Sequence, residues 1–170
     1  MKLTRRQKGA IAEAEITAAA LHAGVGVLRP VTEGTRYDLV FDLGERFLRV
    51  QCKWACLGDG VVTAVLRTSR HTPTNGYVHT TYTARDVDCC ALFCAPLRRT
   101  FLVPIAEVAG AASVRLRVAP ARNNQRTGVR MADAYDLAKM IRDPGAIAQL
   151  GERRHGMAEV VGSSPTSSIP

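Results

Sequence analysis

Apolar positions along the chain follow two periods, and each period predicts a different kind of element. Residues 8–23 repeat with helical spacing and predict a helix, with Thr4 as its cap and Gly24 as its end. The predicted buried stripe of this helix consists of Ala10, Ile11, Ala14, Ala18 and Leu21. Such a stripe would place a mostly alanine face against the rest of the domain.

Shorter apolar runs after residue 24 predict strands, because they alternate or are bounded by turn residues. The strands are expected at residues 25–28, 37–42, 46–54, 61–66, 89–94, 100–103 and, as an edge strand, 114–118. The run 46–54 alternates between an apolar face and a polar face that carries Arg49, Gln51 and Lys53. Further helices are expected at 104–108 and 132–141, and residues 68–85 read as polar and irregular.

A helix, a run of strands and later helices predict an α/β domain with a mixed central β-sheet flanked by helices. Its expected bounds are residues 1–142, and the Gly-, Ser- and Pro-containing residues 143–170 are expected to form a flexible tail. No apolar run is long enough for a membrane span. The basic N-terminus leads into a stretch with acidic residues rather than an apolar signal segment, so a cytoplasmic location is expected.

Charge and cysteine content narrow the classes of function. A net charge of +8 and a pI of about 9.7 suggest a polyanionic partner such as nucleic acid, although a basic protein without one remains the alternative. Aromatic residues make up only 5% of the chain, which argues against a wide base-stacking surface. None of the five cysteines has a convincing zinc spacing, so we expect reduced thiols in the core.

One polar constellation is compatible with phosphodiester chemistry. Asp38 interrupts an apolar strand, and Gln51 and Lys53 share one face of the next long strand. If these strands are neighbours, the oxygen ligands could hold a divalent cation and the lysine could orient or deprotonate a water. By itself the spacing is weak, because a solvated strand face is the more common explanation of such residues.

The surrounding residues strengthen this interpretation. The segments 34–40 (GTRYDLV) and 47–53 (FLRVQCK) resemble the small PD-(D/E)xK nucleases. Lys8-Gly9 followed by Glu13 is similar to the first helix of archaeal Holliday-junction resolvases. The nearest likeness is to group I intron homing endonucleases of this fold, through residues 28–30 (LRP), 67–69 (RTS), 101–104 (FLVP) and 120–125 (PARNNQ). The resemblance covers residues 8–138 and implies a restriction-endonuclease-like core.

The resemblance implies a metal-dependent site. Glu13, Asp38, Gln51 and the backbone carbonyl of Cys52 would ligate or position Mg²⁺ or Mn²⁺, and Lys53 would handle the attacking water. Cleavage would leave a 5′-phosphate and a 3′-hydroxyl. Helical periodicity alone does not choose between Glu13 and Glu15; the resemblance selects Glu13. Gln51 departs from the acid of the general motif, although it keeps a carbonyl oxygen and resembles the homing branch.

Several basic and amide side chains are candidates for contacts with DNA. Any one of the arginines is equally well explained as an ordinary surface charge. The polar stretch 71–81 is another candidate for a DNA-facing loop. The individual candidates are Arg29, Arg36, Arg49, Arg67, Arg70, Arg122, Asn123, Asn124 and Gln125.

The first hypothesis is therefore a site-specific homing-type endonuclease that acts on double-stranded DNA. A Holliday-junction resolvase is the alternative with the same chemistry, and a non-catalytic DNA-binding relative is the alternative from another class. Cutting both strands with one metal site per chain implies a homo-oligomer, a dimer or tetramer. Residues 147–152 and 162–165 can be encoded by D-arm-like and T-arm-like codons, so the tail resembles a translated tRNA gene and suggests a tRNA-gene target.

Overall fold

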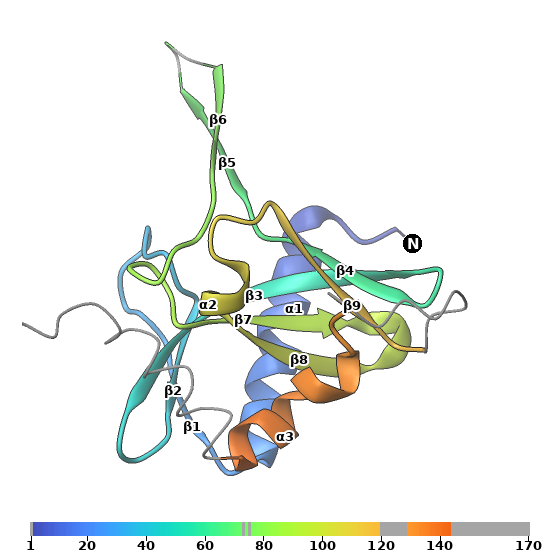
Figure 1. Cartoon of the computed structure of the whole chain (residues 1–170). Helices are drawn as coiled ribbons and strands as arrows, with labels where there is room; N and C mark the ends of the chain where they lie inside the picture. Colours follow the sequence, from blue (N-terminus) through green and yellow to red (C-terminus); the bar gives the residue numbers. More distant parts are fainter. Residues whose placement is uncertain (1, 73, 75, 120–128, 144–170) are drawn as a thin grey trace, which may run out of the picture.

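The computed structural model describes residues 2–72, 74, 76–119 and 129–143. In these residues a β-sheet is packed against helices (Figure 1). The helices are α1 (Arg5–His22), α2 (Ile105–Val108) and α3 (Leu137–Arg142), with short 3-10 helices η1 (Ala95–Leu97) and η2 (Ala132–Tyr135). The strands are β1 (Gly26–Leu28), β2 (Leu39–Asp42), β3 (Phe47–Gly58), β4 (Val61–Val65), β5 (Thr68–Thr72), β6 (Gly76–Thr80), β7 (Cys89–Cys94), β8 (Arg99–Pro104) and β9 (Ser113–Arg117).

Strand β3 is the centre of the sheet. Its residues 47–50 pair antiparallel with β2, and its residues 50–55 pair in parallel with β7 on the other side. From Cys56 onward, β3 pairs antiparallel with β4. Beyond these neighbours lie β1 next to β2, β8 next to β7 and β9 next to β4. The sheet is thus mixed, and the predicted pairing of the Asp38 strand with the Lys53 strand is confirmed.

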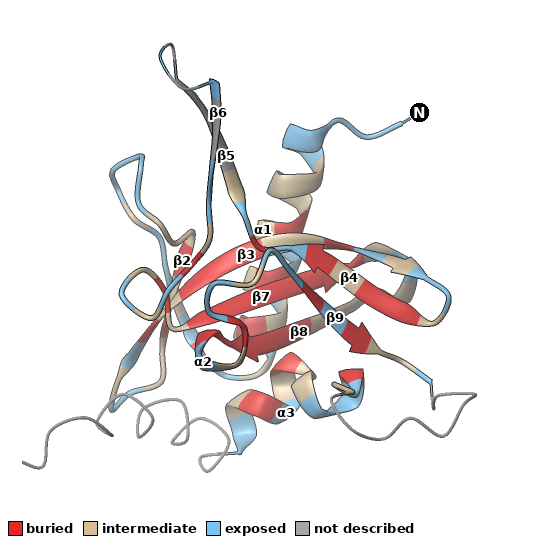
Figure 2. Cartoon of the chain, turned by 45° about the horizontal axis from the view of Figure 1, so that its top comes forward, coloured by how far each residue is buried: buried red, intermediate tan, exposed pale blue. Residues whose placement is uncertain are grey.

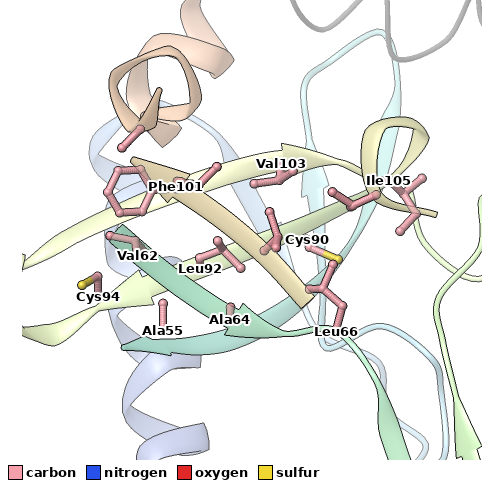
Figure 3. Close-up of a cluster of buried hydrophobic side chains, with 14 of the residues drawn as sticks. Ala55, Val62, Ala64, Leu66, Cys90, Leu92, Cys94, Phe101, Val103 and Ile105 are labelled. Carbon is pink, nitrogen blue, oxygen red and sulfur yellow. The ribbon is translucent and has the colours of Figure 1, made fainter. Parts of the chain in front are cut away.

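The two faces of the sheet bury separate apolar clusters (Figure 2). Helices α1 and α3 cover one face, where Ile16 and Leu39 are fully buried. Strands β4 and β9 fold over the other face, where Leu92 and Phe101 are fully buried (Figure 3). Every residue of β7 is buried because this strand is covered on both faces.

Helix α1 has the predicted cap at Thr4 and the predicted end before Gly24, although it begins at Arg5 rather than at residue 8. Thr4 and Gln7 form a reciprocal capping box, in which the Thr4 Oγ1 accepts from the Gln7 N–H at 3.2 Å and the Gln7 Oε1 accepts from the Thr4 N–H at 2.9 Å. The helix ends before Gly24, whose φ of 84° is a conformation that favours glycine.

The predicted buried face of α1 is wrong. The buried residues are Ala12, Ile16 and Ala20, whereas Leu21 of the predicted stripe is 56% exposed. Alanines occur on all sides of this helix, so their spacing carries little information about which side faces the sheet. The one bulky residue that is fully buried, Ile16, decides which side faces the sheet, because it removes the most apolar surface from water.

The expectation of irregular structure at residues 68–85 is also wrong. Strands β5 and β6 form a two-stranded hairpin that projects from the body of the domain (Figure 1). Polar alternation hides a strand that has no apolar face to bury. The dipeptide Asn75-Gly76 is a hairpin-turn signal that could have revealed it.

Smaller differences lie at the C-terminal end of the described chain. The expected helix 132–141 is divided into η2 and α3 at Asp136.

Four of the five cysteines are buried and all are free thiols, as predicted for a reduced core. Among the described residues, no helix is long and apolar enough to span a membrane. Residues 120–128 and the predicted tail from 144 to 170 lie outside the described residues.

Candidate active site

The candidate site lies where β3 changes partners. Strand β2 pairs with β3 up to Val50, and β4 begins to pair with it at Cys56. In the described chain, the β3 residues between these points have a strand partner on the β7 side only. Asp38 precedes β2 rather than lying inside it, and its N–H donates to the Val50 carbonyl at 3.0 Å. The departing strand therefore carries the carboxylate to the side of β3.

The Asp38 carboxylate takes over the hydrogen bonding of β3 at this point. Its Oδ2 accepts the backbone N–H of Cys52 at 2.7 Å and a short hydrogen bond from the Gln51 side-chain amide. The same amide nitrogen also faces the Cys52 carbonyl oxygen at 3.4 Å. Three of the predicted oxygen-bearing groups, those of Asp38, Gln51 and Cys52, are thus brought together as expected.

The two carboxylates of the site are held in conditions that disfavour their charge. Burial raises the pKa of Asp38, against the opposing hydrogen bond from the Cys52 N–H and the charge of Lys53. Burial also raises the pKa of Glu13, and the negative charge of Asp38 raises it further, with Arg29 opposing. A nearby cation would relieve both effects.

The buried stripe of α1 also distinguishes the two candidate glutamates. Glu13 follows the buried Ala12, and its side chain is 34% exposed at the edge of the packed face. Its Oε2 lies 3.5 Å from the Arg29 Nη1. Glu15 is exposed. The geometry therefore favours Glu13 over Glu15 as the residue near Asp38.

Lys53 points from the same strand toward a residue that sequence reasoning missed. Its Nζ donates to the Tyr82 hydroxyl at 3.0 Å and lies 5.0 Å from the centroid of the Tyr82 ring. Tyr82 follows β6 and is only 3% exposed. The available signal was a tyrosine within an otherwise polar stretch, but nothing in the sequence connects it with Lys53.

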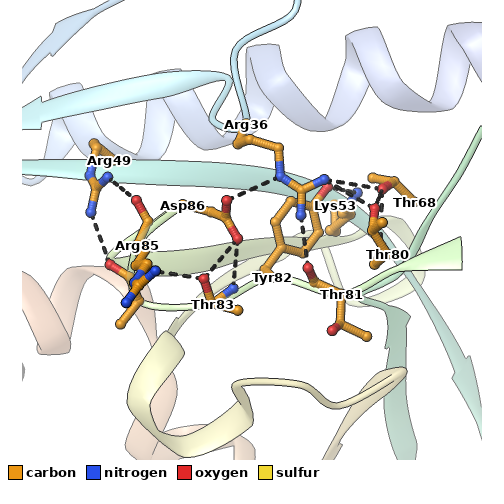
Figure 4. A network of polar contacts seen from close by, with 11 residues as sticks. Arg36, Arg49, Lys53, Thr68, Thr80, Thr81, Tyr82, Thr83, Arg85 and Asp86 are labelled. Carbon is orange, nitrogen blue, oxygen red and sulfur yellow. Dashed lines mark hydrogen bonds and ion pairs between the residues drawn. The ribbon is translucent and has the colours of Figure 1, made fainter.

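Two of the arginines expected near DNA have intramolecular partners (Figure 4). Arg49 forms a two-pronged pair with Asp88, at 3.1 Å from Nε and 3.2 Å from Nη2. Arg36 pairs with Asp86 at 3.4 Å and bonds the residues at the base of the β5–β6 hairpin. These contacts indicate a structural role for both, and their contact with DNA stays a prediction.

The other candidates for DNA contact divide into exposed and undescribed residues. Arg29 has a side chain that is 55% exposed, and Arg67 is exposed between β4 and β5. The side chain of Arg70 lies outside the described part of the structure, as do the residues Arg122, Asn123, Asn124 and Gln125. The contact of these residues with DNA stays a prediction.

The donor set fits a hard divalent cation. No cluster of three or more His, Cys, Asp or Glu side chains that could hold a metal occurs within the described ranges. The available oxygens come from two carboxylates, an amide and a backbone carbonyl, which are ligand types of Mg²⁺ and Ca²⁺. The Gln51 amide N–H groups now lie between the Asp38 carboxylate and the Cys52 carbonyl, where two acceptors converge as they would on a cation.

Comparisons with known proteins place the chain in a family. A search of curated proteins finds no match. The chain is similar in fold to the solved structure of a bacterial homing endonuclease, I-Ssp6803I, with 24% identity, a TM-score of 0.66 and coverage of 90% of this chain and 99% of that one. The family model described as PD-(D/E)XK endonuclease matches residues 3–138, which is most of the chain. Nucleases of this family are generally dependent on divalent metal ions, and this chain belongs to the PD-(D/E)XK endonuclease family.

Proposed function

We propose that this endonuclease is a metal-dependent, site-specific enzyme of the homing type, which hydrolyses phosphodiester bonds of double-stranded DNA. The observation that carries the proposal is the convergence of Asp38, Gln51 and the Cys52 carbonyl beside Lys53. The similarity in fold to a bacterial homing endonuclease supports the homing type. The products would carry a 5′-phosphate and a 3′-hydroxyl.

Glu13, Asp38, Gln51 and the Cys52 carbonyl would hold the cation, with Mg²⁺ or Mn²⁺ as the proposed ions. When bound, the ion offsets the charge of the scissile phosphate and acidifies a water. The raised pKa values of Glu13 and Asp38 support this assignment, because both carboxylates gain from a nearby positive charge. The Gln51 amide must turn over for its oxygen to join the donor set, since its nitrogen now faces Asp38.

Lys53 would orient the attacking water or take its proton. It lies on the strand that carries Gln51, two residues further on, so both side chains are on one face. Its charge acts on Asp38, whose pKa it lowers in part. The lysine ammonium is therefore close enough to act on the Asp38 carboxylate, and a phosphate and a water would bind beside these two groups.

The contact with DNA would be largely electrostatic. The net charge of +8 favours a polyanion, and the exposed Arg29 and Arg67 are suitable for phosphate contacts. Arg29 already lies beside Glu13, so it could exchange that carboxylate for a phosphate of the substrate. The projecting β5–β6 hairpin, the loop carrying Asn123, Asn124 and Gln125, and Arg70 are further proposed contacts.

The target is proposed to be a tRNA gene or its neighbourhood, on the basis of the tRNA-like coding of residues 147–152 and 162–165. One site of this kind cuts one strand at a time. A double-strand break therefore requires a symmetric homo-oligomer, a dimer or a tetramer.

The first experiment is a nuclease assay with the purified chain, in Mg²⁺ or in EDTA. The substrates are duplexes of tRNA genes from related genomes and an immobile four-way junction. Wild type is compared with Lys53→Ala and Asp38→Ala. The control is Asp133→Asn, because the Asp133 side chain is 68% exposed and pairs with Arg99, which is not a residue of the proposed site. We expect wild type to cut a duplex in Mg²⁺, and we expect the cleavage rate to fall more than about 100-fold in both site variants. Loss of a residue that only supports a metal ligand typically costs less than this.

The outcomes separate the alternatives. Symmetric cutting of the junction alone would replace the homing type with a resolvase. Binding with a steep salt dependence, but without cutting of any substrate in Mg²⁺, would indicate a DNA-binding relative that lost activity. Full activity of Lys53→Ala would refute the site assignment.

A further inference from the structure

Tyr82 occupies an unusual place for a residue in a polar segment. It follows the polar hairpin strand β6 after one residue, yet it is only 3% exposed and packs with the cluster under β4 and β9. Its hydroxyl accepts a hydrogen bond of 3.0 Å from the Lys53 Nζ. A buried phenol that presents its hydroxyl to the proposed water-handling lysine combines a fixed apolar body with a polar tip.

A second cation holds the Tyr82 ring. The Arg36 guanidinium lies 4.7 Å from the ring centroid, and its Nη2 donates to the carbonyl of Thr81 at 2.8 Å. Its Nη1 donates to the Oγ1 of Thr80 at 3.1 Å and to that of Thr68 at 3.4 Å. Arg36 therefore connects both strands at the foot of the hairpin with the tyrosine beside it (Figure 4).

The same arginine is close in sequence to the carboxylate of the site. Arg36 precedes Asp38 by two residues, and its Nε pairs with Asp86 at 3.4 Å on the other side. The segment that delivers Asp38 to β3 is thus attached to the segment that delivers Tyr82 to Lys53. The carboxylate and the lysine are held through one connected set of contacts rather than independently.

Lys53 needs such support because a lysine ammonium sits on a flexible four-carbon stem. Fixing a long side chain costs rotamer freedom, and its contacts must offset that cost. The Tyr82 hydroxyl and ring provide a hydrogen bond and a cation–π contact from a buried, immobile group.

We propose that Tyr82 is a positioning residue for Lys53, and that Arg36 fixes the Tyr82 ring at the foot of the β5–β6 hairpin. This inference rests on the proposed function of Lys53 in DNA cleavage. Tyr82 acts through the lysine and does not itself touch the scissile phosphate. A simple packing role for the tyrosine is the competing explanation, and it requires only the ring.

The test is Tyr82→Phe, which keeps the ring and removes the hydroxyl. The matched control is Tyr135→Phe, because the Tyr135 hydroxyl donates to Glu107 at 2.6 Å, with neither residue in the proposed site. The measurement is the single-turnover cleavage rate of a cognate duplex at saturating protein, together with the dissociation constant in Ca²⁺ and the melting temperature. We expect Tyr82→Phe to lose about tenfold or more in rate, the value of one hydrogen bond to a charged group, with unchanged DNA binding.

A double-mutant comparison distinguishes positioning from packing. In a Lys53→Ala background, Tyr82→Phe should cause no further loss of the residual rate, since its effect passes through the absent ammonium. Equal losses in both backgrounds would overturn the inference. So would a rate for Tyr82→Phe equal to that of Tyr135→Phe.

A readout that does not need cleavage keeps this inference separate from the proposed function. Lys53 is acetylated with acetic anhydride in the metal-free protein, and its rate of modification is followed by mass spectrometry. We expect a several-fold faster modification of Lys53 in Tyr82→Phe than in wild type or Tyr135→Phe, because without the Tyr82 hydroxyl the side chain is freer to present its neutral amine to the anhydride. If wild type cuts no DNA, the proposed function fails while this rate still decides the contact; an unchanged rate refutes the positioning role.

Discussion

Two polar clusters lie along the first half of β3 and its neighbours, and they satisfy their charges in opposite ways. In one, Arg49 is paired with Asp88 and Arg36 with Asp86. In the other, Asp38 and Glu13 are both carboxylates, with Gln51 as the amide between Asp38 and the backbone. The first cluster is an internal support, whereas the second holds carboxylates whose charged form a bound cation would stabilise.

The pKa shifts express this difference. The hydrogen bonds that Arg49 donates to Asp88 raise the pKa of Arg49, so the pair favours the charged form of the arginine. Burial raises the pKa of Asp86, but hydrogen bonds from Thr83 and the charge of Arg36 outweigh it and lower the value overall. The pKa values of Asp38 and Glu13 are raised instead. Ionisable groups whose surroundings disfavour the charged form are typical of functional sites.

The largest effect on stability should come from breaking the paired cluster. We expect Arg49→Met to lower the free energy of unfolding by about 2–3 kcal/mol, because it removes the bidentate partner of the half-buried Asp88 and the hydrogen bonds that Arg49 donates to the carbonyls of Ala84 and Arg85. The measurement is urea denaturation at neutral pH.

The matched control is Arg29→Met, which removes a more exposed arginine from its pair with Glu13. An exposed ion pair contributes about 0–1 kcal/mol, so this loss should be small. Equal losses in the two variants would show that the Arg49 cluster is an ordinary surface pair rather than an internal support.

Much of this contrast could be read from the sequence, but only on one side. Asp38, Gln51 and Lys53 were found because strand alternation and a family-like motif place them on adjoining strands, and the strand pairing is confirmed. The arginines looked alike in the sequence. Whether an arginine faces solvent or an aspartate forty residues away depends on tertiary packing, which strand periodicity does not report.

The predictions for the buried face of α1 and for the β5–β6 hairpin were wrong for a related reason. An alanine-rich helix has no strongly amphipathic face, so its orientation was decided by Ile16, which the predicted stripe omitted. The hairpin β5–β6 has no apolar alternation, and Tyr82 at its foot acquires meaning only through contact with Lys53. Local patterns predicted where elements lie, whereas their mutual contacts had to be seen.

A smaller change would sharpen the contrast by adding charge to the cluster of Asp38, Glu13 and Gln51. We expect Gln51→Glu to retain cleavage and to bind Mg²⁺ more tightly, because a third carboxylate replaces the amide. Without the ion, repulsion from Asp38 should lower the melting temperature. Tenfold tighter binding would increase the stabilisation by saturating Mg²⁺ by about 1.4 kcal/mol over wild type.

This metal-linked effect is measured by thermal unfolding over a Mg²⁺ titration. Gln51→Met provides the control, since it has neither charge nor a ligand oxygen and should show a weaker response than wild type. If the three proteins gained the same stability from Mg²⁺, Gln51 would not belong to the metal site.

The smallest effect concerns pH in the metal-free protein. The pKa of Asp38 is raised above its usual value of 3.8, chiefly by burial, so the folded state holds its proton more tightly than the unfolded state. The contribution of Asp38 to stability is therefore most favourable below pH 3.8 and falls as the pH rises through the folded-state pKa.

Asp38→Asn has no such proton to lose, so the difference in unfolding free energy between wild type and this variant should shift against wild type from about pH 4 upward. Urea unfolding of both proteins in EDTA between pH 3.5 and 7 measures that difference, and a trend in favour of wild type would mean that the Cys52 and Gln51 hydrogen bonds outweigh burial. Repeating the series in Mg²⁺ should abolish the trend, because a bound cation would stabilise the charged form of Asp38. Arg49 and Arg36 do the same for Asp88 and Asp86 in the other cluster.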